Sequence, residues 1–434
     1  MKTFNFSEIR KPLLMKNGLV WDKSVKDFKK KDLLIENGKF SRIGKVDDKS
    51  FNGNIIDLTG KNVLPGFFDM HVHLREPGRE DKETIKTGSA AAFTGGFTGI
   101  CSMPNTDPVC DNIEVVKYIK DKAKNLPVEV FPIGAVSKGL KGEEIAEFGD
   151  MVEGGIVGVS DDGNSVDSAE LMRRALEYSK MFDIPVIVHE EDSRLSGAGV
   201  MNEGFYSTKL GLPGIPDISE TAMIMRDIEI LKYSGGKLHI AHLSVKDGVK
   251  LIKDAKDLGL KITAEVTPHH LTLTEKEIEK YDPNFKMKPP LRSEKDVQEL
   301  KKGVIDGTID AFATDHAPHT YDEKEEEFDK SPCGIIGLET AFSIILREFY
   351  FNKLLTMSEI IDRISLNPRK ILNIPLPEIK AGSKTEITIV DLNKKWTVKK
   401  DDFYSKSQNS PYIGTEFKAK IVASINKNKI WSDI

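Results

Sequence analysis

Histidine and aspartate side chains that could bind a metal ion follow several strand-like runs of this chain. His71 and His73 end the run 63–73, and side chains two apart on a strand point to the same side, so two imidazoles can converge on one ion. The other candidates end or follow later strand-like runs: Asp161, Asp162, His189, His242 and Asp315. Imidazole suits zinc or another transition metal, and a bridging carboxylate suits a pair of ions. These residue types predict a metal site, with Asp161 and Asp162 as alternatives.

The chemistry of such a site is the opening or closing of an amide-like bond. A bound metal ion lowers the pKa of water to about 7 and polarises a carbonyl group. Asp315 could move a proton between the nucleophile and the leaving group. The sequence contains no GxSxG elbow, no GxxxxGK[ST] loop and no strand-linked GxGxxG, so acyl-serine, nucleotide-binding and dinucleotide-binding classes have no support.

The elements that must position these residues alternate between strand and helix. We count eight apolar strand candidates, rich in Val, Ile and Phe: 63–73, 96–103, 128–135, 155–160, 184–189, 238–243, 261–266 and 310–315. Eight strand–helix units predict the α/β class and a (β/α)8 TIM-like barrel, whose active site lies at the C-terminal ends of the strands. The candidate ligands come from that rim.

Helical spacing of apolar residues supports the alternation. It occurs in 168–182, where Met181 is the last apolar residue of the pattern, in 219–234, where Met225 belongs to the pattern, and in 245–258.

The two ends of the chain differ from the middle. Residues 1–62 include a run with an Asn-Gly pair between alternating apolar positions, which predicts a β-hairpin, and residues 377–434 include two strand-like runs. We expect the ends to pair into one small β-domain. The predicted division is 1–63 and 377–434 for the β-domain, with the barrel at 64–376.

The composition limits the classes of binding partner and the cellular compartment that we expect. Lys and Arg total 63 against 68 for Asp and Glu, a net charge of −5. The chain therefore lacks the excess of basic residues that is typical of proteins binding nucleic acid or an anionic membrane. The three cysteines, Cys101, Cys110 and Cys333, form no CxxC pair and fit a reducing cytoplasm. No apolar run reaches 18 residues, and the first residues do not resemble a secretory signal. We therefore expect a cytoplasmic protein outside the membrane.

Several motifs together resemble one enzyme family. The runs DMHVHLREPGRE, MPNTDP, SDDG, HEED, AHLS, EVTPHHL, KPPLR, ATDHAPH and GIIGLET are similar to dihydroorotases of the long bacterial type, in the amidohydrolase superfamily. The resemblance covers essentially the whole chain. It implies a zinc-dependent enzyme that interconverts N-carbamoyl-L-aspartate and L-dihydroorotate in pyrimidine biosynthesis.

The resemblance also implies roles for individual residues. His71 and His73 would bind one zinc ion and His189 and His242 the other, with one or two ions per chain. The family pattern selects Asp162 over Asp161 as the bridge between two ions. Asp315 would bind the first ion and act as the general acid and base.

The implied substrate contacts lie beside these ligands: His73, Arg75, Asn105, Lys288, His319, Cys333 and Gly334. Arg75 suits a substrate carboxylate because its planar fork pairs with both oxygens. The family usually has Asn where this chain has Lys288, and we expect Lys288 to face the site, with an outward orientation as the alternative. Cys333 and Gly334 belong to the lid loop.

Two other functions compete with this interpretation. The first is a related cyclic amidase of the hydantoinase or allantoinase kind. The second is a dihydroorotase-like protein without catalysis that serves as a partner of aspartate transcarbamoylase; such proteins generally lose metal ligands, whereas all six candidates are present here. We expect a small-molecule substrate and a homo-oligomer, with aspartate transcarbamoylase as a candidate partner.

Overall fold

Each of the eight strand candidates contains a strand of the barrel in the computed structural model, which describes residues 5–434. The strands are β7 (Phe67–Val72), β8 (Phe97–Ser102), β9 (Glu129–Pro132), β10 (Val159–Ser160), β11 (Val186–Val188), β14 (Leu238–Ile240), β15 (Ile262–Val266) and β16 (Ala311–Phe312). All of their ladders are parallel. Parallel strands separated by helices are the pattern that the sequence predicts.

Two single bridges close these strands into a ring. The ladders form one sheet of order β7-β8-β9 and another of order β10-β11-β14-β15-β16. Gly134 pairs with Val159 in parallel between β9 and β10, and Val72 pairs with His316 in parallel beyond β16. The predicted (β/α)8 barrel is therefore confirmed.

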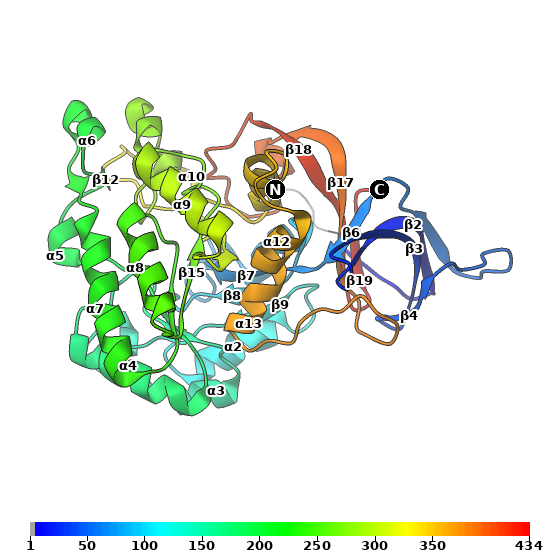
Figure 1. Cartoon of the computed structure of the whole chain (residues 1–434), viewed down its shortest axis with the longest axis horizontal. Coiled ribbons are helices and arrows are strands. Elements are labelled where there is room, and N and C mark those ends of the chain that lie inside the picture. Colours follow the sequence, from blue (N-terminus) through cyan, green and yellow to red (C-terminus); the bar gives the residue numbers. More distant parts are fainter. Residues whose placement is uncertain (1–4) are drawn as a thin grey trace.

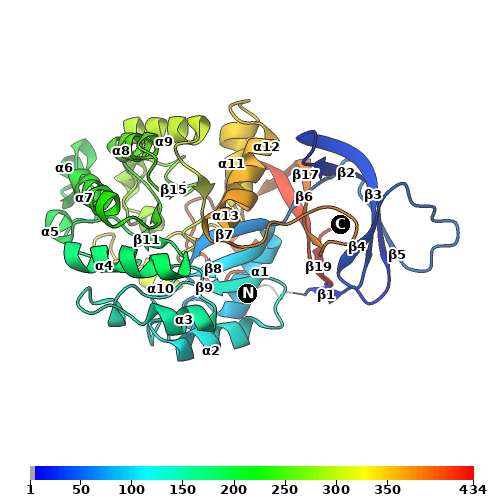
Figure 2. The ribbon, with the colours of Figure 1, turned by 60° about the horizontal axis from the view of Figure 1, so that its bottom comes forward.

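Helices surround the barrel strands (Figure 2). The longer ones are α1 (Ile85–Thr94), α2 (Ile113–Ala123), α3 (Phe148–Gly154), α4 (Ala169–Ser179), α7 (Ile218–Ser234), α8 (Lys246–Asp257) and α9 (Glu294–Asp306). Shorter helices are α5 (Ser193–Ser196), α6 (Phe205–Leu210), α10 (Tyr321–Lys324), α11 (Ala341–Ile345), α12 (Met357–Ile361) and α13 (Asn367–Ile371). Within residues 5–434, no helix combines the length and the apolar character needed to cross a membrane.

Side-chain caps explain where several of these helices begin. Ser168 accepts a hydrogen bond from Leu171 N at the start of α4, and Asn112 accepts from Glu114 N and Val115 N at the start of α2. Two methionines of the helical patterns are exposed. Met181 lies in a 3-10 turn beyond α4 and is 75% exposed, and Met225 on α7 is 55% exposed.

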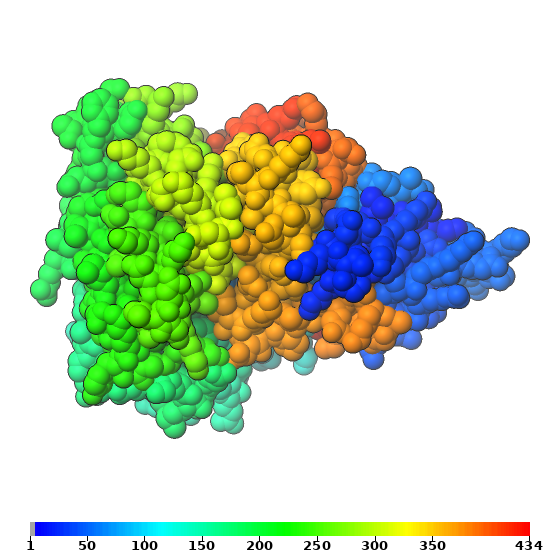
Figure 3. Space-filling view, viewed as in Figure 1, coloured from blue at the N-terminus to red at the C-terminus, as the bar shows by residue number. Residues whose placement is uncertain are grey.

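A second sheet brings the two ends of the chain together (Figure 1). It contains β1 (Ser7–Glu8), β2 (Leu13–Asp22), β3 (Asp27–Glu36), β4 (Lys39–Gly44), β5 (Asn54–Asp57), β6 (Asn62–Pro65), β17 (Glu386–Thr397), β18 (Glu416–Asn426) and β19 (Lys429–Ser432). In the space-filling view, the blue N-terminal residues lie at one end of the molecule against orange residues of the last third (Figure 3). The small β-domain built from both ends is present as expected.

The predicted hairpin is confirmed within this sheet. β3 and β4 pair antiparallel, and Asn37 and Gly38 between them both have positive φ values, 51° and 72°. Such a turn matches the twist of the flanking strands. A short pair of strands, β12 (Met201–Asn202) and β13 (Gly214–Ile215), lies apart from both large sheets.

The first strand candidate, 63–73, contributes one strand to the β-domain and one to the barrel. β6 pairs with β17 of the β-domain, and β7 starts the barrel after Gly66. A Cβ atom at position 66 would lie 2.3 Å from Thr98 Oγ1, so the backbone approach at this break requires glycine. Since β6 runs across residue 63, the domain boundaries after 63 and 376 remain a proposal.

Candidate metal centre

The six predicted ligands lie together at the C-terminal rim of the barrel. His71 lies on β7 and His73 follows it, and the other four ligands follow the ends of β10, β11, β14 and β16 in chain order. All six residues are at most 6% exposed: His71, His73, Asp162, His189, His242 and Asp315. Parallel strands end at the same rim, so residues distant in sequence meet there.

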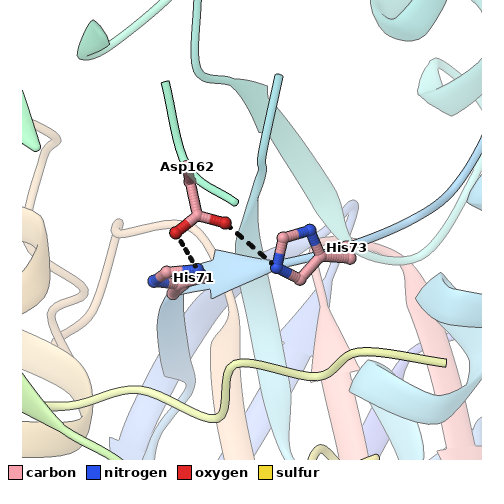
Figure 4. Close-up of side chains that lie close together, drawn as sticks. All are labelled: His71, His73 and Asp162. Atoms are coloured by element: carbon pink, nitrogen blue, oxygen red, sulfur yellow. Dashed lines mark ion pairs between the residues drawn. The ribbon is translucent and has the colours of Figure 1, made fainter. Parts of the chain in front are cut away.

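Asp162 lies at the centre of the cluster. Its Oδ1 is 3.3 Å from His71 Nε2, and its Oδ2 is 3.3 Å from His73 Nε2 (Figure 4). Oδ1 is also 3.4 Å from His242 Nε2 and 3.9 Å from His189 Nδ1. One carboxylate therefore faces four imidazoles, the arrangement that a bridging ligand requires.

Asp315 approaches the same imidazoles from β16. Its Oδ1 is 3.1 Å from His73 Nε2 and 3.6 Å from His71 Nε2. Three overlapping groups have ligand atoms within 4.8 Å of one another: His71, His73 and Asp162; His71, His242 and Asp315; Asp162, His189 and His242. His71 Nε2 is buried between the two carboxylates but makes no hydrogen bond in the described chain. A buried ring nitrogen aimed into a pocket of acidic oxygens fits a metal ion, which would take the place of the proton on that nitrogen.

The neighbouring aspartate has a different environment. Asp161 Oδ1 accepts hydrogen bonds from the backbone N–H groups of Val136 (2.8 Å) and Ser137 (2.9 Å), and the Ser137 hydroxyl donates to Oδ2. Asp161 thus ties the loop after β9 to the loop after β10. The structure brings Asp162, and not Asp161, into the cluster.

The charges of the cluster stabilise one another. Burial favours neutral histidine, but the carboxylates of Asp162 and Asp315 outweigh it and hold the pKa of His71 well above its ordinary value. Burial likewise opposes ionisation of Asp162 and Asp315, and the surrounding histidines, His71 foremost, keep both carboxyl pKa values below their ordinary range. The site therefore offers ionised carboxylates at neutral pH.

Asn105 contacts a predicted ligand. Its Oδ1 lies 2.8 Å from His73 Nδ1, so the imidazole can donate there and direct its Nε2 to Asp162 and Asp315. The resemblance implies a substrate contact for Asn105. The structure adds a contact with the histidine.

Arg75 and His319 lie side by side next to the metal cluster. Arg75 Nε donates to Pro318 O at 3.2 Å, and burial lowers the pKa of its guanidinium to about 10. His319 Nε2 donates to Cys333 O at 2.8 Å, which joins the loop after β16 to the predicted lid. Gly334 N donates to Lys286 O at 2.9 Å. The predicted substrate residues on these two loops are therefore connected to one another.

Lys288 lies at the mouth of the site. Its Nζ is 3.0 Å from Glu191 Oε1, and its side chain is 41% exposed. Lys288, Glu191 and His189 line one cleft together with Asn164. The ammonium is thus paired with a protein carboxylate while remaining within the cleft that leads to His189.

Three site residues have left-handed backbone conformations. The φ values are 60° for Arg75, 32° for His242 and 44° for Asp315. Non-glycine residues in this region cost about 1–3 kcal/mol each and persist where the surrounding structure imposes them. Sequence analysis gave no sign of this strain.

Sequence analysis also missed Glu265. Its Oε1 lies 2.8 Å from His71 Nδ1, on the side opposite the cluster, and the residue is 1% exposed. The only available signal was a glutamate within the apolar strand candidate 261–266, since buried charges require partners.

Known proteins resemble this chain in sequence and in fold. The family model described as dihydro-orotase-like matches residues 60–248. The curated dihydroorotases of Thermoanaerobacter sp. (strain X514) and Syntrophus aciditrophicus (strain SB) are 49% and 46% identical to this chain over 96% of its length, and the matches cover 96% and 98% of those proteins.

The similar solved structures are more distant in sequence. The L-hydantoinase (dihydropyrimidinase) from Arthrobacter aurescens superposes with a TM-score of 0.85 at 24% identity, covering 97% of this chain and 96% of that chain. The dihydropyrimidinase from Brevibacillus agri NCHU1002 gives 0.80 at 20% identity, covering 96% and 94%. These likenesses show the shared fold, whereas the sequence matches reach further: the chain belongs to the dihydroorotase family.

Proposed function

We propose that this protein is a metal-dependent dihydroorotase that interconverts N-carbamoyl-L-aspartate and L-dihydroorotate in pyrimidine biosynthesis. The observation that carries the proposal is the buried cluster of four histidines and two aspartates at the rim of the barrel. The proposed substrates rest on the relatives named dihydroorotase, which are 45–49% identical to this chain over nearly its whole length.

The proposed cofactor is zinc, with two ions per chain that share Asp162. His71, His73 and Asp315 would hold one ion, and His189 and His242 the other. A bound zinc ion supplies a Lewis acid for the substrate carbonyl and a hydroxide nucleophile at neutral pH.

The chain's own residues supply proton transfer and orientation. Asp315 is ionised at neutral pH because the neighbouring histidines lower its carboxyl pKa, so in the ring-opening direction it can accept a proton from the attacking water and pass it to the leaving nitrogen. Arg75, held by Pro318 O, would pair with the substrate carboxylate through its remaining N–H groups. Asn105, His319, Cys333 and Gly334 would complete the pocket, and Lys288 would add a cation at its mouth.

A related cyclic amidase is the second candidate. Solved structures named hydantoinase and dihydropyrimidinase share the fold at 18–24% identity, which carries no substrate information. The decisive measurement is the rate of the purified protein with dihydroorotate, hydantoin and allantoin side by side. Turnover of hydantoin or allantoin above that of dihydroorotate would overturn the proposal. The absence of turnover with all three, at full metal content, would instead favour a non-catalytic partner of aspartate transcarbamoylase.

Elemental analysis tests the cofactor separately. We expect between one and two zinc equivalents per chain, and loss of activity after chelation with recovery on adding zinc. Full activity without bound metal would contradict the proposed chemistry. A homo-oligomer, association with aspartate transcarbamoylase and a cytoplasmic location remain proposals; light scattering, alone and with the transcarbamoylase, tests the first two.

A further inference from the structure

A chain of polar side chains runs behind His71 through the interior of the barrel. Glu265 on β15 places Oε1 2.8 Å from His71 Nδ1 and Oε2 3.3 Å from His239 Nε2. His239 on β14 places Nδ1 2.7 Å from Thr263 Oγ1. His71, Glu265 and His239 are each at most 1% exposed. These contacts cross three barrel strands and lie on the side of His71 that faces away from Asp162.

Strand register explains why these residues meet. His239 and Thr263 are direct partners in the parallel ladder of β14 and β15. Glu265 lies two residues beyond Thr263, so both side chains point to the same face of β15.

Donor and acceptor roles follow from the chemistry of the groups. An ionised carboxylate only accepts hydrogen bonds, and a neutral imidazole has one N–H donor and one acceptor nitrogen. The Glu265 carboxylate therefore accepts from His71 Nδ1–H, whereas its Oε2 and the facing His239 Nε2 lie 3.3 Å apart without hydrogen-bond geometry in the described chain. The acceptor nitrogens are then His71 Nε2, which faces the two aspartates, and His239 Nδ1, to which the Thr263 hydroxyl donates.

We propose that Glu265 and His239 are positioning residues that hold His71 in the tautomer with a protonated Nδ1, which leaves Nε2 for a metal ion. Glu265 makes the contact with His71, and His239 lies against the second carboxylate oxygen, with its Nε2 3.3 Å from Oε2. The inference rests on the proposed metal site. Partners of this kind behind ligating histidines commonly change metal affinity by about 10- to 100-fold.

The test is the Zn²⁺ affinity of the full-length protein at pH 7, measured by competition with a chromophoric chelator. Glu265→Gln keeps the size of the side chain but removes the charge, and we expect about 10- to 100-fold weaker binding of the tighter ion. His239→Leu should weaken binding as well, because Glu265 Oε2 loses the polar Nε2 group that lies 3.3 Å away. His239→Gln should restore most of the affinity, since its amide N–H can replace Nε2–H.

Glu339→Gln is the matched control. Glu339 is a partly buried glutamate that accepts hydrogen bonds from Tyr404 N and Ser405 N, outside the cluster. Its variant should bind Zn²⁺ like the parent. Thermal unfolding of each metal-free variant, and the visible spectrum of its Co²⁺ form, separate a change of ligand geometry from a loss of fold.

The outcomes separate the inference from the proposed function. Parent-like Zn²⁺ affinity in Glu265→Gln and His239→Leu, with lower unfolding temperatures alone, would show a structural network and overturn the inference. Equal losses of Zn²⁺ affinity in His239→Gln and His239→Leu would show that the N–H group at this position has no role, and would also overturn the inference. A parent protein that binds no Zn²⁺ would overturn the proposed function itself, and the inference with it.

Discussion

Two adjacent aspartates show how far a residue's role depends on its surroundings. Asp161 accepts two backbone N–H groups, whereas Asp162 faces four imidazoles. We expect Asp162→Asn to lower Zn²⁺ affinity more than about 100-fold, beyond the usual effect of residues behind the ligands. Asp161→Asn should keep the metal and lower stability instead. Zinc content and unfolding temperature of the two variants check this, and the reverse pattern would show that Asp161 is the ligand.

Asp315 is proposed both to bind a metal ion and to transfer a proton. Its Oδ1 lies 3.1 Å from His73 Nε2, and the residue is 3% exposed. Asp315→Asn removes the basic oxygen without changing the shape of the side chain, so we expect kcat with dihydroorotate to fall by about 10²–10⁴-fold or more. The rate is measured on protein whose zinc content has been restored and verified. Activity within tenfold of the parent would remove Asp315 from this role.

Sequence indicates the ligands better than the residues that orient them. Histidine and aspartate at strand ends are recognisable by type and position. Glu265 and Asn105 contact the histidines of the site, and His239 contacts Glu265, only because particular strands and loops become neighbours. These strands and loops become neighbours only when the barrel closes, so the spacing of residues along the chain does not predict their contacts.

At the scale of elements, the sequence predicted the barrel strands but not the break that divides the first strand candidate into β6 and β7. Apolar runs of four to eight residues indicate buried strands, and all eight candidates contain one. The break at Gly66 between β6 and β7, by contrast, depends on the close approach of Thr98 from the next strand. Met181 and Met225 belong to the helical patterns and are nevertheless exposed, because helical spacing does not tell where a helix ends or how wide its buried face is.

The predicted lid illustrates how a loop positions the site. Gly334 has φ 154°, and a Cβ atom there would lie 2.6 Å from Ala317 O and 2.7 Å from His319 Cδ2. We expect Gly334→Ala to displace His319 and Cys333, and to lower kcat/KM by about 10²-fold, the scale of a 1 Å misplacement. Zinc content should not change.

Gly211→Ala is the control for the lid variant. Gly211 also has positive φ, 68°, but nothing lies within 4 Å of its added Cβ, and it ends α6 away from the cluster. It should lose some stability and no activity. Equal kinetic losses in both glycine variants would show that backbone strain in general, and not the lid, lowers the rate.

At the scale of the whole molecule, the C-terminal segment packs on the barrel near Glu339. The carboxyl accepts hydrogen bonds from Tyr404 N (2.9 Å) and Ser405 N (3.2 Å), and it lines a cavity with Phe342 of α11 and Trp396 of β17. Ser343 Oγ on α11 donates to Ala419 O of β18 at 2.8 Å. The barrel and the sheet built from both chain ends are therefore linked through this region.

Glu339 should make the stability of this junction depend on pH. Burial raises the pKa of its carboxyl to about 8, with the nearby Glu83 adding to the effect, whereas the ordinary value is 4.5. Between these values the folded protein retains a proton that the unfolded chain has released, so stability contributed by this group falls as pH rises from about 5 to about 8. Above the folded pKa both states are ionised, and the contribution stays constant.

Glu339→Gln removes this titration. Because glutamine has no proton to release, the free energy of unfolding of the variant should rise relative to the parent between pH 5 and pH 8, by at most about 1.4 kcal/mol per pH unit. Urea unfolding of both metal-free proteins at pH 5, 6.5 and 8 measures the difference, and other groups such as Asp69 cancel because they titrate in both. Parallel pH profiles would mean that Glu339 remains ionised in the folded protein and that the backbone N–H groups of Tyr404 and Ser405 compensate its burial fully.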